Sequence, residues 1–388
     1  SDTFILRRAM NVREVSIEGV DEVVRLVKGG QSVLVAPNHA DPFVLSHIGR
    51  RYGLRFHFMA AREGFDQSPR LRAFVLQHCG AFSVDRQGND LAAIKTAMKI
   101  LQGCRYPLVI FPEGEIYHHL ERLAPLNEGV ATILLRAAEK LPEGKDAYVI
   151  PTALRYFYSS KVADTFSQRL SAMEDRIGWK PRPNIDVVDR IYRLGAGLLA
   201  VKEVEFLGQA QQGPFVERIR GLQQKLLEMV ESKHRVERAG TVPERVKLLQ
   251  GKVRKVLTDP RADISQEQKE ELYDDMDTLF LVAQLYSYPG QYLRENPTVH
   301  RIAETIFKLE EDVLSKGNYP APRQVHVRFG EPVGVKEFLE EGSFNSRTGV
   351  RAMTELLSES IQSMIESMPY ALPADRTRKE AGSYADPR

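Results

Sequence analysis

The chain has few cysteines, little net charge and no long apolar run, and each shortage excludes a class of protein. Its two cysteines, Cys79 and Cys104, suit neither a metal site nor a disulfide framework, which favours a reducing compartment. A net charge of +2 argues against a general nucleic-acid binder. The longest run of apolar residues and glycine near the middle, Leu194 to Val201, is far shorter than the ~20 residues of a membrane-spanning helix.

Two missing motifs narrow the choice further. No basic segment followed by an apolar one opens the chain, as it would in a secretory signal peptide. No Gly-x-Ser-x-Gly motif occurs, which disfavours a hydrolase of the α/β-hydrolase type. The 388 residues are 43% hydrophobic, enough to bury a sizeable core and to form two domains. We therefore expect a cytoplasmic protein, either free or peripheral on the inner face of a membrane.

Short apolar segments alternate with helical patterns through the N-terminal part of the chain. The segments expected to form strands are 15–18, 33–36, 56–59, 81–84, 108–111 and 148–154. The helical patterns lie near 43–52, 69–78, 89–103 and 128–140. Such alternation predicts an α/β fold whose mainly parallel sheet is covered by helices.

Between Tyr158 and Pro322 the pattern changes to long amphipathic helices, with apolar residues recurring at helical spacing. A strand pattern resumes at Val325, so the helices interrupt the sequence that forms the sheet. The predicted domains are an α/β core over residues 1–158, a large all-helical insertion over 159–322, and a closing strand with a C-terminal helix over 323–388.

Asn38 and His39 follow the apolar run 33–37 and precede Asp41 and Pro42. This order sets an imidazole at the carboxyl end of an expected buried strand, the edge at which ligands collect in open α/β sheets. A histidine oriented by an aspartate is the simplest general base for deprotonating a hydroxyl near neutral pH. In the alternative interpretation, His39 only satisfies the strand end and Asp41 caps the following helix.

Three later segments follow in a fixed order along the chain. The first, Gly80 to Arg86, is a short strand with an arginine just past its end. The second, Leu108 to Gly114, is an apolar strand that ends in a Pro-Glu-Gly turn. The third, Tyr148 to Leu154, is a strand with an internal proline, Pro151. Together with Asn38-His39, these segments make an ordered set of four sequence blocks.

The ordered set resembles the four blocks of the glycerolipid acyltransferase family, of the lysophosphatidate (1-acylglycerol-3-phosphate) type. The family pattern is Asn-His-(x)4-Asp, then Gly-x-x-Phe-x-x-Arg, then Phe-Pro-Glu-Gly, and then an apolar strand ending in proline. The resemblance covers residues 13–157, and residues 325–333 look like the family's closing strand. It implies transfer of a fatty acyl group from acyl-CoA or acyl-carrier protein to the hydroxyl of a lysophospholipid or a related acceptor, without cofactor or metal.

The resemblance also assigns roles to residues. His39 is expected to be the general base, and Asp41 the carboxylate that orients it. The residues expected to bind substrate are Asn38, Phe82, Arg86, Glu113, Gly114 and Pro151. Arg86 suits a phosphate because its guanidinium is a rigid fork of donors. No acyl-enzyme is implied, since no serine or cysteine nucleophile accompanies His39.

Two of these roles have structural alternatives. In one, Arg86 is a surface arginine paired with Asp85 or Asp90. In the other, Glu113 is a turn carboxylate in water, rather than a group that binds acceptor hydroxyls or positions Arg86. The residues alone leave both alternatives open.

The sequence departs from the family pattern at two places. The family has four residues between His and Asp, whereas Asp41 lies two positions after His39. Our hypothesis is that three residues are missing between them and that Asp41 is the family aspartate. In the alternative, the chain is a short variant and Asp41 is only an N-cap. The third block often continues Thr-Arg-Ser in the family, but residues 115–117 differ here, so that Arg122 or Arg155 would have to replace the second phosphate-binding arginine.

Residues 233–261 carry nine lysines and arginines against three acidic residues, and the next stretch, 262–275, is acidic. One interpretation is two solvated helix faces that partly neutralise each other. The other is a basic face on anionic lipid, where each lysine or arginine adds ~1 kcal/mol. The expected partners are the acyl donor, the lysolipid-type acceptor and, in the second interpretation, an anionic membrane; nucleic acid is not expected.

Two classes of function remain open. The first is the acyltransferase described above. The second is a non-catalytic lipid-binding or scaffold protein on the same fold, which the short spacing between His39 and Asp41 keeps open. An assay that combines acyl donors with lysolipids separates the two.

Overall fold

The computed structural model describes most of the chain, but several predicted features fall outside the described residues. The described residues are 2–8, 10–38, 42–62, 80–84, 90–114, 121–259, 261, 262, 264–288, 290–315, 317, 319 and 321–368. His39, Asp41 and Arg86 lie outside them, as do Cys79 and the helix expected at 69–78. What the sequence predicts for these residues stays a prediction.

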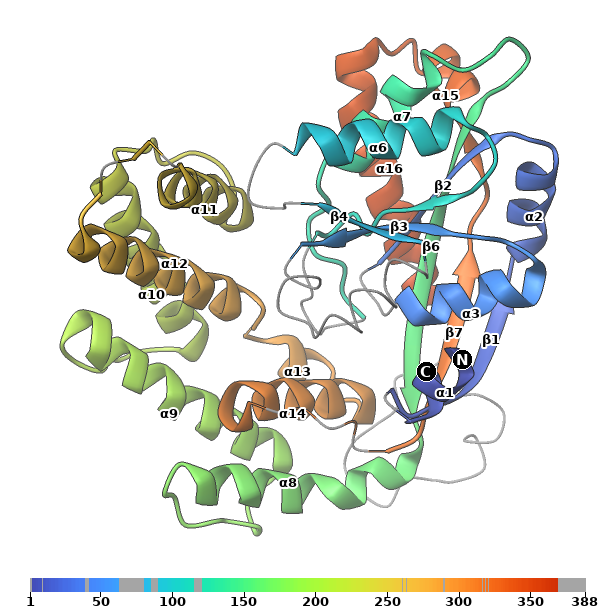
Figure 1. Cartoon of the computed structure of the whole chain (residues 1–388). Coiled ribbons are helices and arrows are strands. Elements are labelled where there is room, and N and C mark those ends of the chain that lie inside the picture. The colour runs from blue at the N-terminus through green and yellow to red at the C-terminus, as the bar shows by residue number, and fades with distance from the viewer. Residues whose placement is uncertain are drawn as a thin grey trace. The chain divides into compact units, whose positions relative to one another are not determined.

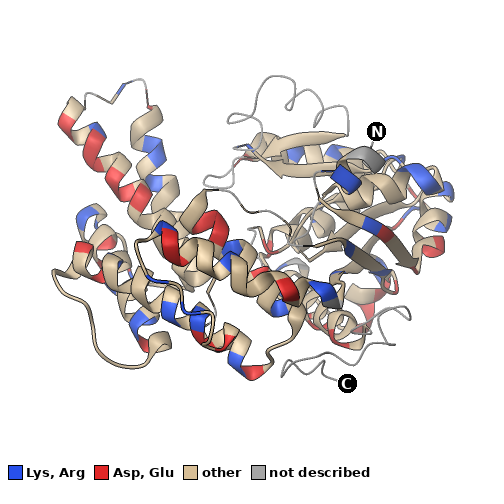
Figure 2. Cartoon of the chain, turned by 90° about the horizontal axis from the view of Figure 1, so that it is seen from below, with Lys and Arg blue, Asp and Glu red and all other residues tan. Residues whose placement is uncertain are grey.

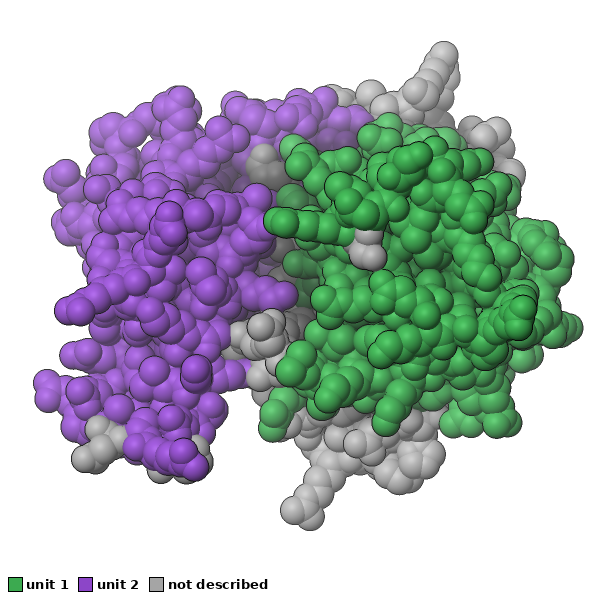
Figure 3. Space-filling model, turned by 90° about the horizontal axis from the view of Figure 1, so that it is seen from above, with its two compact units in different colours: residues 1–85, 90–162, 319–388 green, residues 86–89, 163–318 purple. Residues whose placement is uncertain are grey.

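The chain divides into two compact units, which Figure 3 shows in different colours. Unit 1 contains the sheet and combines residues 1–85, 90–162 and 319–388. Unit 2 combines residues 86–89 and 163–318, and its described part is helical. After residue 162 the chain leaves unit 1, and it returns to unit 1 at residue 319.

Unit 1 is built on one sheet, whose described part has eight strands (Figure 1). The strands are β1 Val12–Glu18, β2 Ser32–Pro37, β3 His57–Ala61, β4 Ala81–Val84, β5 Leu108–Val109, β6 Ala147–Tyr158, β7 Arg323–Phe329 and β8 Val333–Gly334. Their order is β1-β7-β6-β2-β5-β3-β4, with β8 paired to β6. From β6 to β4 all neighbours are parallel, whereas β7 is antiparallel to β6 and parallel to β1. The predicted α/β fold, with a mainly parallel sheet and a helical insertion before the closing strand β7, is confirmed.

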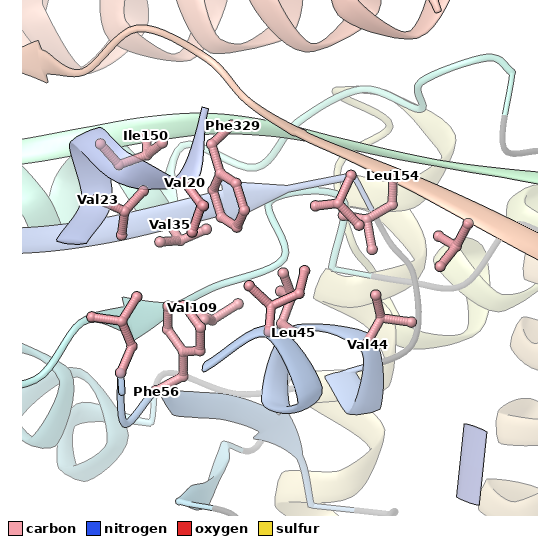
Figure 4. Packing of buried hydrophobic residues seen from close by; sticks show 14 of the residues in the cluster. Val20, Val23, Val35, Val44, Leu45, Phe56, Val109, Ile150, Leu154 and Phe329 are labelled. Atoms are coloured by element: carbon pink, nitrogen blue, oxygen red, sulfur yellow. The ribbon is translucent and has the colours of Figure 1, made fainter. Parts of the chain in front are cut away.

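Helices cover both faces of the sheet, because successive residues of a strand point to opposite sides. In β2, Val33 and Val35 pack on one face, and Leu34 and Ala36 pack on the other. Helices α1 to α3 cover the first face, shown in Figure 4, and α6, α7, α15 and α16 cover the second. The helices of unit 1 are α1 Asp2–Arg8, α2 Val20–Lys28, α3 Pro42–Tyr52, α6 Leu91–Gln102, α7 Gly129–Ala138, the 3-10 helix Ser160–Val162, α15 Val335–Glu341 and α16 Ser346–Ser367.

Strand β4 has its predicted bounds, β1, β2, β3 and β6 extend beyond their predicted ranges, and β5 is shorter than predicted. Strand β5 was expected to reach residue 111 but ends at Val109, although the N–H of Ile110 still donates to the carbonyl of Val35 at 3.1 Å. It ends early because the chain turns at Pro112. Strand β6 continues to Tyr158 because β7 stays paired with it that far.

Unit 2 is held together by apolar contacts and by buried ion pairs. Its helices are α8 Ala163–Arg176, α9 Val187–Leu207, α10 Phe215–His234, α11 Val242–Thr258, α12 Gln266–Tyr286, α13 Tyr292–Glu295 and α14 Val299–Leu314. Helices α10, α11 and α12 share an apolar core that includes Leu226, Leu249 and Leu279. A fully buried pair, Glu174 and Arg190, joins α8 to α9. Among the helices described in either unit, none combines the length and the apolar composition needed to cross a membrane.

Candidate active site

The parallel strands bring several predicted site residues to one edge of the sheet. Strand β2 ends at Pro37 and is followed by Asn38, while its neighbour β5 leads into the turn at 112–114. Strand β4 ends at Val84, two residues before Arg86. Carboxyl ends of parallel strands share an edge, where open α/β sheets bind ligands. Because β2 and β4 are three strand positions apart, or about 14 Å, a ligand that reaches both must extend across β5 and β3.

Asn38 ties the end of β2 to β6 through three hydrogen bonds. Its backbone N–H donates to the carbonyl of Thr152 at 3.2 Å. Its Nδ2 donates to the carbonyl of Leu154 at 3.0 Å, and its Oδ1 accepts from the N–H of Leu154 at 2.7 Å. The side-chain amide thus replaces a peptide group and extends the pairing of the two strands beyond Pro37. Asn38 is 2% exposed and anchors the chain at this edge; its predicted contact with substrate stays a prediction.

Replacing Asn38 by alanine is expected to lower the free energy of unfolding by about 2–4 kcal/mol. The substitution leaves the buried N–H and carbonyl of Leu154 without partners, and each unsatisfied group costs about 1–3 kcal/mol. Urea denaturation measures this change. Ser32, at the other end of β2, provides a control, since its buried hydroxyl has no hydrogen-bond partner among the described residues. Ser32→Ala should therefore leave stability nearly unchanged. An Asn38→Ala protein as stable as the wild type would contradict the anchoring role.

The turn that follows β5 is held by Asn127. Its Nδ2 donates to the carbonyls of Pro112 at 3.2 Å and Glu113 at 3.0 Å. Its backbone N–H also donates to the carbonyl of Pro112, at 2.8 Å. Gly114 has a φ of 72°, and a Cβ at this position would lie 2.7 Å from Nδ2 of Asn127. Both the backbone conformation and the close approach therefore require glycine at residue 114.

Glu113 is fixed on this turn by a hydrogen bond to the backbone. It is 7% exposed, and its Oε2 accepts from the N–H of Ala124 at 2.8 Å. The alternative that Glu113 is a turn carboxylate in water is therefore wrong. A buried carboxyl group with a fixed oxygen is a suitable element of a binding site, and its contact with the acceptor stays a prediction.

Pro151 and Phe82, also predicted to bind substrate, are parts of the sheet. Pro151 faces Ala36 of β2, and its carbonyl accepts from the N–H of Gly330 at 2.8 Å. Residues 148 and 149 of β6 pair with β8, and residues 152–158 pair with β7. Pro151 lies between these two groups, where strand pairing needs no N–H donor, so a proline is tolerated. Phe82 of β4 is half-buried against the core of the second face. Both residues support the sheet, and their predicted contact with substrate stays a prediction.

Arg155, considered above as a second phosphate-binding arginine, is a core residue. It is 1% exposed, and its Nη2 donates to Oε1 of Glu121 at 2.6 Å. Its Nη1 donates to the carbonyls of Ile365 at 3.2 Å and Met368 at 3.1 Å, at the C-terminal end of α16, where a positive charge is favourable. Because these bonds use both terminal nitrogens, the idea that Arg155 grips the acceptor is wrong. Arg122 is exposed, and its predicted role as the second phosphate-binding arginine stays a prediction.

Sequence reasoning missed Asn127 and the partner of Arg155. The pairing of Arg155 had a signal in the sequence. Arg155 is the one charged residue in the apolar strand β6, and a charge in such a strand indicates that it is buried with a partner. Asn127 offered no signal, since it meets the turn only through the return of the chain.

The described part of the edge is a frame of two fixed elements, Asn38 and the turn at 112–114. Among the residues that the structure describes, no three histidine, cysteine, aspartate or glutamate side chains lie together as metal ligands. Glu113 is the one titratable side chain of this frame, and the frame contains no histidine. The roles predicted for His39, Asp41 and Arg86, which follow these strands in the sequence, stay predictions.

Comparison with known proteins finds one family to which the N-terminal part of the chain is similar. Residues 13–155 match the family model described as Acyltransferase. The match runs from β1 into β6 and includes Asn38, Glu113, Gly114 and Pro151. No curated protein matches the chain. Residues 13–155 are therefore similar to the Acyltransferase family, and acyl transfer is the general chemistry that this match supports.

Proposed function

We propose that the protein transfers a fatty acyl group from acyl-CoA or acyl-carrier protein to the hydroxyl of a lysophospholipid or a related acceptor. The observation that carries this proposal is the anchoring of Asn38 to Leu154, at the carboxyl end of β2 and directly before His39 in the sequence. The fixed turn at Glu113 and Gly114 follows the neighbouring strand at the same edge. The acyltransferase match over residues 13–155 supports the same chemistry.

His39 acts in this proposal as the general base. It takes the proton of the acceptor hydroxyl while the hydroxyl oxygen attacks the thioester carbonyl. When the carbon–sulfur bond breaks, the departing thiolate takes this proton from the imidazolium. Asp41 accepts a hydrogen bond from the other ring nitrogen, which selects the tautomer and stabilises the imidazolium. No cofactor is required, because the thioester already activates the acyl group.

Arg86 is proposed to bind a phosphate of the acceptor. A guanidinium can make two parallel hydrogen bonds to phosphate oxygens, which fixes orientation as well as position. Since Arg86 follows β4 and His39 follows β2, the acceptor would lie across the carboxyl ends of the strands between them, with the Glu113 turn along its path. An acceptor that carries both a hydroxyl and a phosphate suits this arrangement.

Replacing Arg86 by alanine is expected to raise the KM for a phosphate-containing acceptor strongly and to change kcat less, because the lost interaction binds the ground state. Arg86→Lys should recover only part of the loss, since an ammonium lacks the planar fork of donors. Steady-state kinetics with varied acceptor measure both effects. If the acceptor KM is unchanged in both variants, Arg86 is the surface arginine of the alternative interpretation.

The proposed reaction is tested by incubating the protein with radiolabelled acyl-CoA or acyl-carrier protein and a panel of lysolipids, with chromatographic detection of the ester. Binding of a lysolipid without turnover would instead favour a non-catalytic lipid-binding or scaffold protein. The short spacing between His39 and Asp41 is the feature that favours this second candidate. An intact mass equal to that of the 388 residues would contradict the hypothesis that three residues are missing between them.

A further inference from the structure

Helices α11 and α12 form a hairpin whose two helices carry opposite charge. Helix α11 has five lysines and arginines against one glutamate, and α12 has six aspartates and glutamates against one lysine. The two helices lie side by side, one banded blue and the other red, at the upper left of Figure 2. Both pack with α10 around one apolar core.

The charges on the inner side of the hairpin are already paired within this bundle. Arg245 of α11 donates to Glu231 of α10 at 2.7 Å. Asp275 of α12 bonds to His234 at 2.7 Å and to Lys233 at 3.0 Å, at the C-terminal end of α10. Lys252 of α11 also donates to the carbonyl of His234 at 2.6 Å, and Glu271 of α12 pairs with Lys233 at 3.5 Å.

The charges on the outer side are different. Lys247 and Lys255 of α11 and Asp274 and Asp277 of α12 are exposed, and within the described part of the chain they form no ion pair. Both helices of the hairpin therefore present charges that their own bundle leaves unused.

Large apolar side chains accompany these outer charges. Leu248 is 55% exposed, and Tyr273 and Phe280 are each 60% exposed. Helical spacing sets Tyr273 and Phe280 on one face of α12 with Asp277, and Leu248 on the same face of α11 as Lys255, two turns away. Exposed apolar and aromatic side chains next to unpaired charges are typical of an interaction surface.

A surface of one sign does not fit this hairpin. Anionic lipid would attract the lysines of α11 but repel the carboxylates of α12, and exposed charges act on each other over ~10 Å at 0.1 M salt. A partner that presents a basic helix beside an acidic one fits both halves. The hairpin of a second copy of this chain is such a partner.

We propose that two copies of the chain associate through this hairpin, with α11 of each copy lying along α12 of the other. A two-fold axis makes the interface self-complementary, so that every contact occurs twice. Lys247 and Lys255 of one copy face Asp274 and Asp277 of the other, and the apolar side chains between them are removed from water. The charges set orientation and register, and the apolar contacts supply most of the affinity.

Sedimentation velocity of the full chain over a range of concentrations, without substrate, measures this association. Lys247→Glu with Lys255→Glu makes both outer faces acidic, and Asp274→Lys with Asp277→Lys makes both basic. Each double variant should raise the dimer dissociation constant by at least about tenfold, because an exposed ion pair contributes a factor of about 1.5–5 and several pairs become repulsive. An equimolar mixture of the two double variants should dimerise again, since each acidic face then meets a basic one.

A matched control is Lys95→Glu with Lys99→Glu on α6, which makes the same change in charge at exposed positions of unit 1 and should leave association unchanged. A wild-type chain that stays monomeric at every concentration overturns the proposal, as does a mixture of the two hairpin variants that fails to dimerise. A monomeric wild type that sediments with anionic but not with neutral vesicles would assign the hairpin to lipid instead. The result is independent of acyl transfer, because no acyl substrate is present.

Discussion

Replacing His39 by alanine is expected to lower the rate of acyl transfer by about 10²–10⁴-fold, the usual contribution of a positioned general base. Stability should change little, because Asn38 makes hydrogen bonds that anchor this end of β2. Single-turnover kinetics and urea denaturation measure the two quantities separately. Turnover near that of the wild type would show that His39 is not the base.

Asp41→Asn separates the two roles considered for Asp41. Helix α3 begins at Pro42, so Asp41 precedes its first residue, and asparagine caps a helix about as well as aspartate does. The variant should therefore keep its stability and lose activity, because an amide stabilises the imidazolium less than a carboxylate does. Full activity in Asp41→Asn would leave Asp41 as a helix cap only.

Replacing Arg155 by methionine is expected to lower the free energy of unfolding by about 3–5 kcal/mol, the usual cost of removing one partner of a buried ion pair. The substitution leaves the Glu121 carboxylate buried without its guanidinium, and the carbonyls of Ile365 and Met368 lose a donor. Methionine keeps much of the volume and shape, so the loss is chiefly electrostatic. Urea denaturation measures the change.

The double variant Arg155→Met with Glu121→Gln tests this cause. Removing both charges should restore part of the stability, since no buried charge is then left unpaired. A double variant that loses the sum of both single effects would mean that Arg155 acts through packing or through α16 instead. A stability change below ~1 kcal/mol in Arg155→Met would contradict the buried pair itself.

The parallel sheet and its carboxyl edge could be predicted because their signals are local. The run Val33 to Ala36 is apolar at every position, which is typical of a strand buried on both faces, and the structure buries these residues between two helical layers. Helices and strands alternate along the chain, which requires crossovers and so favours parallel pairing. The end of β2 before Asn38 followed from the same pattern.

The bonds that make this edge rigid could not be predicted. Asn38 meets Leu154, more than a hundred residues later in the chain, and Arg155 meets the end of α16 over an even longer separation. No local pattern specifies such partners, because they depend on strand order and on register.

The sequence by itself determined the class of fold, the interruption of the sheet by helices, and the order of the motif residues along one strand edge. These depend on hydrophobic periodicity and on spacing, which are properties of short segments. Only the tertiary structure decided that Arg155 is a core residue, that Glu113 is buried and fixed, and that Asn127 holds the turn at Gly114. The reason is physical: whether a polar side chain binds a ligand or the protein depends on which donors and acceptors the folded chain brings within about 3 Å of it.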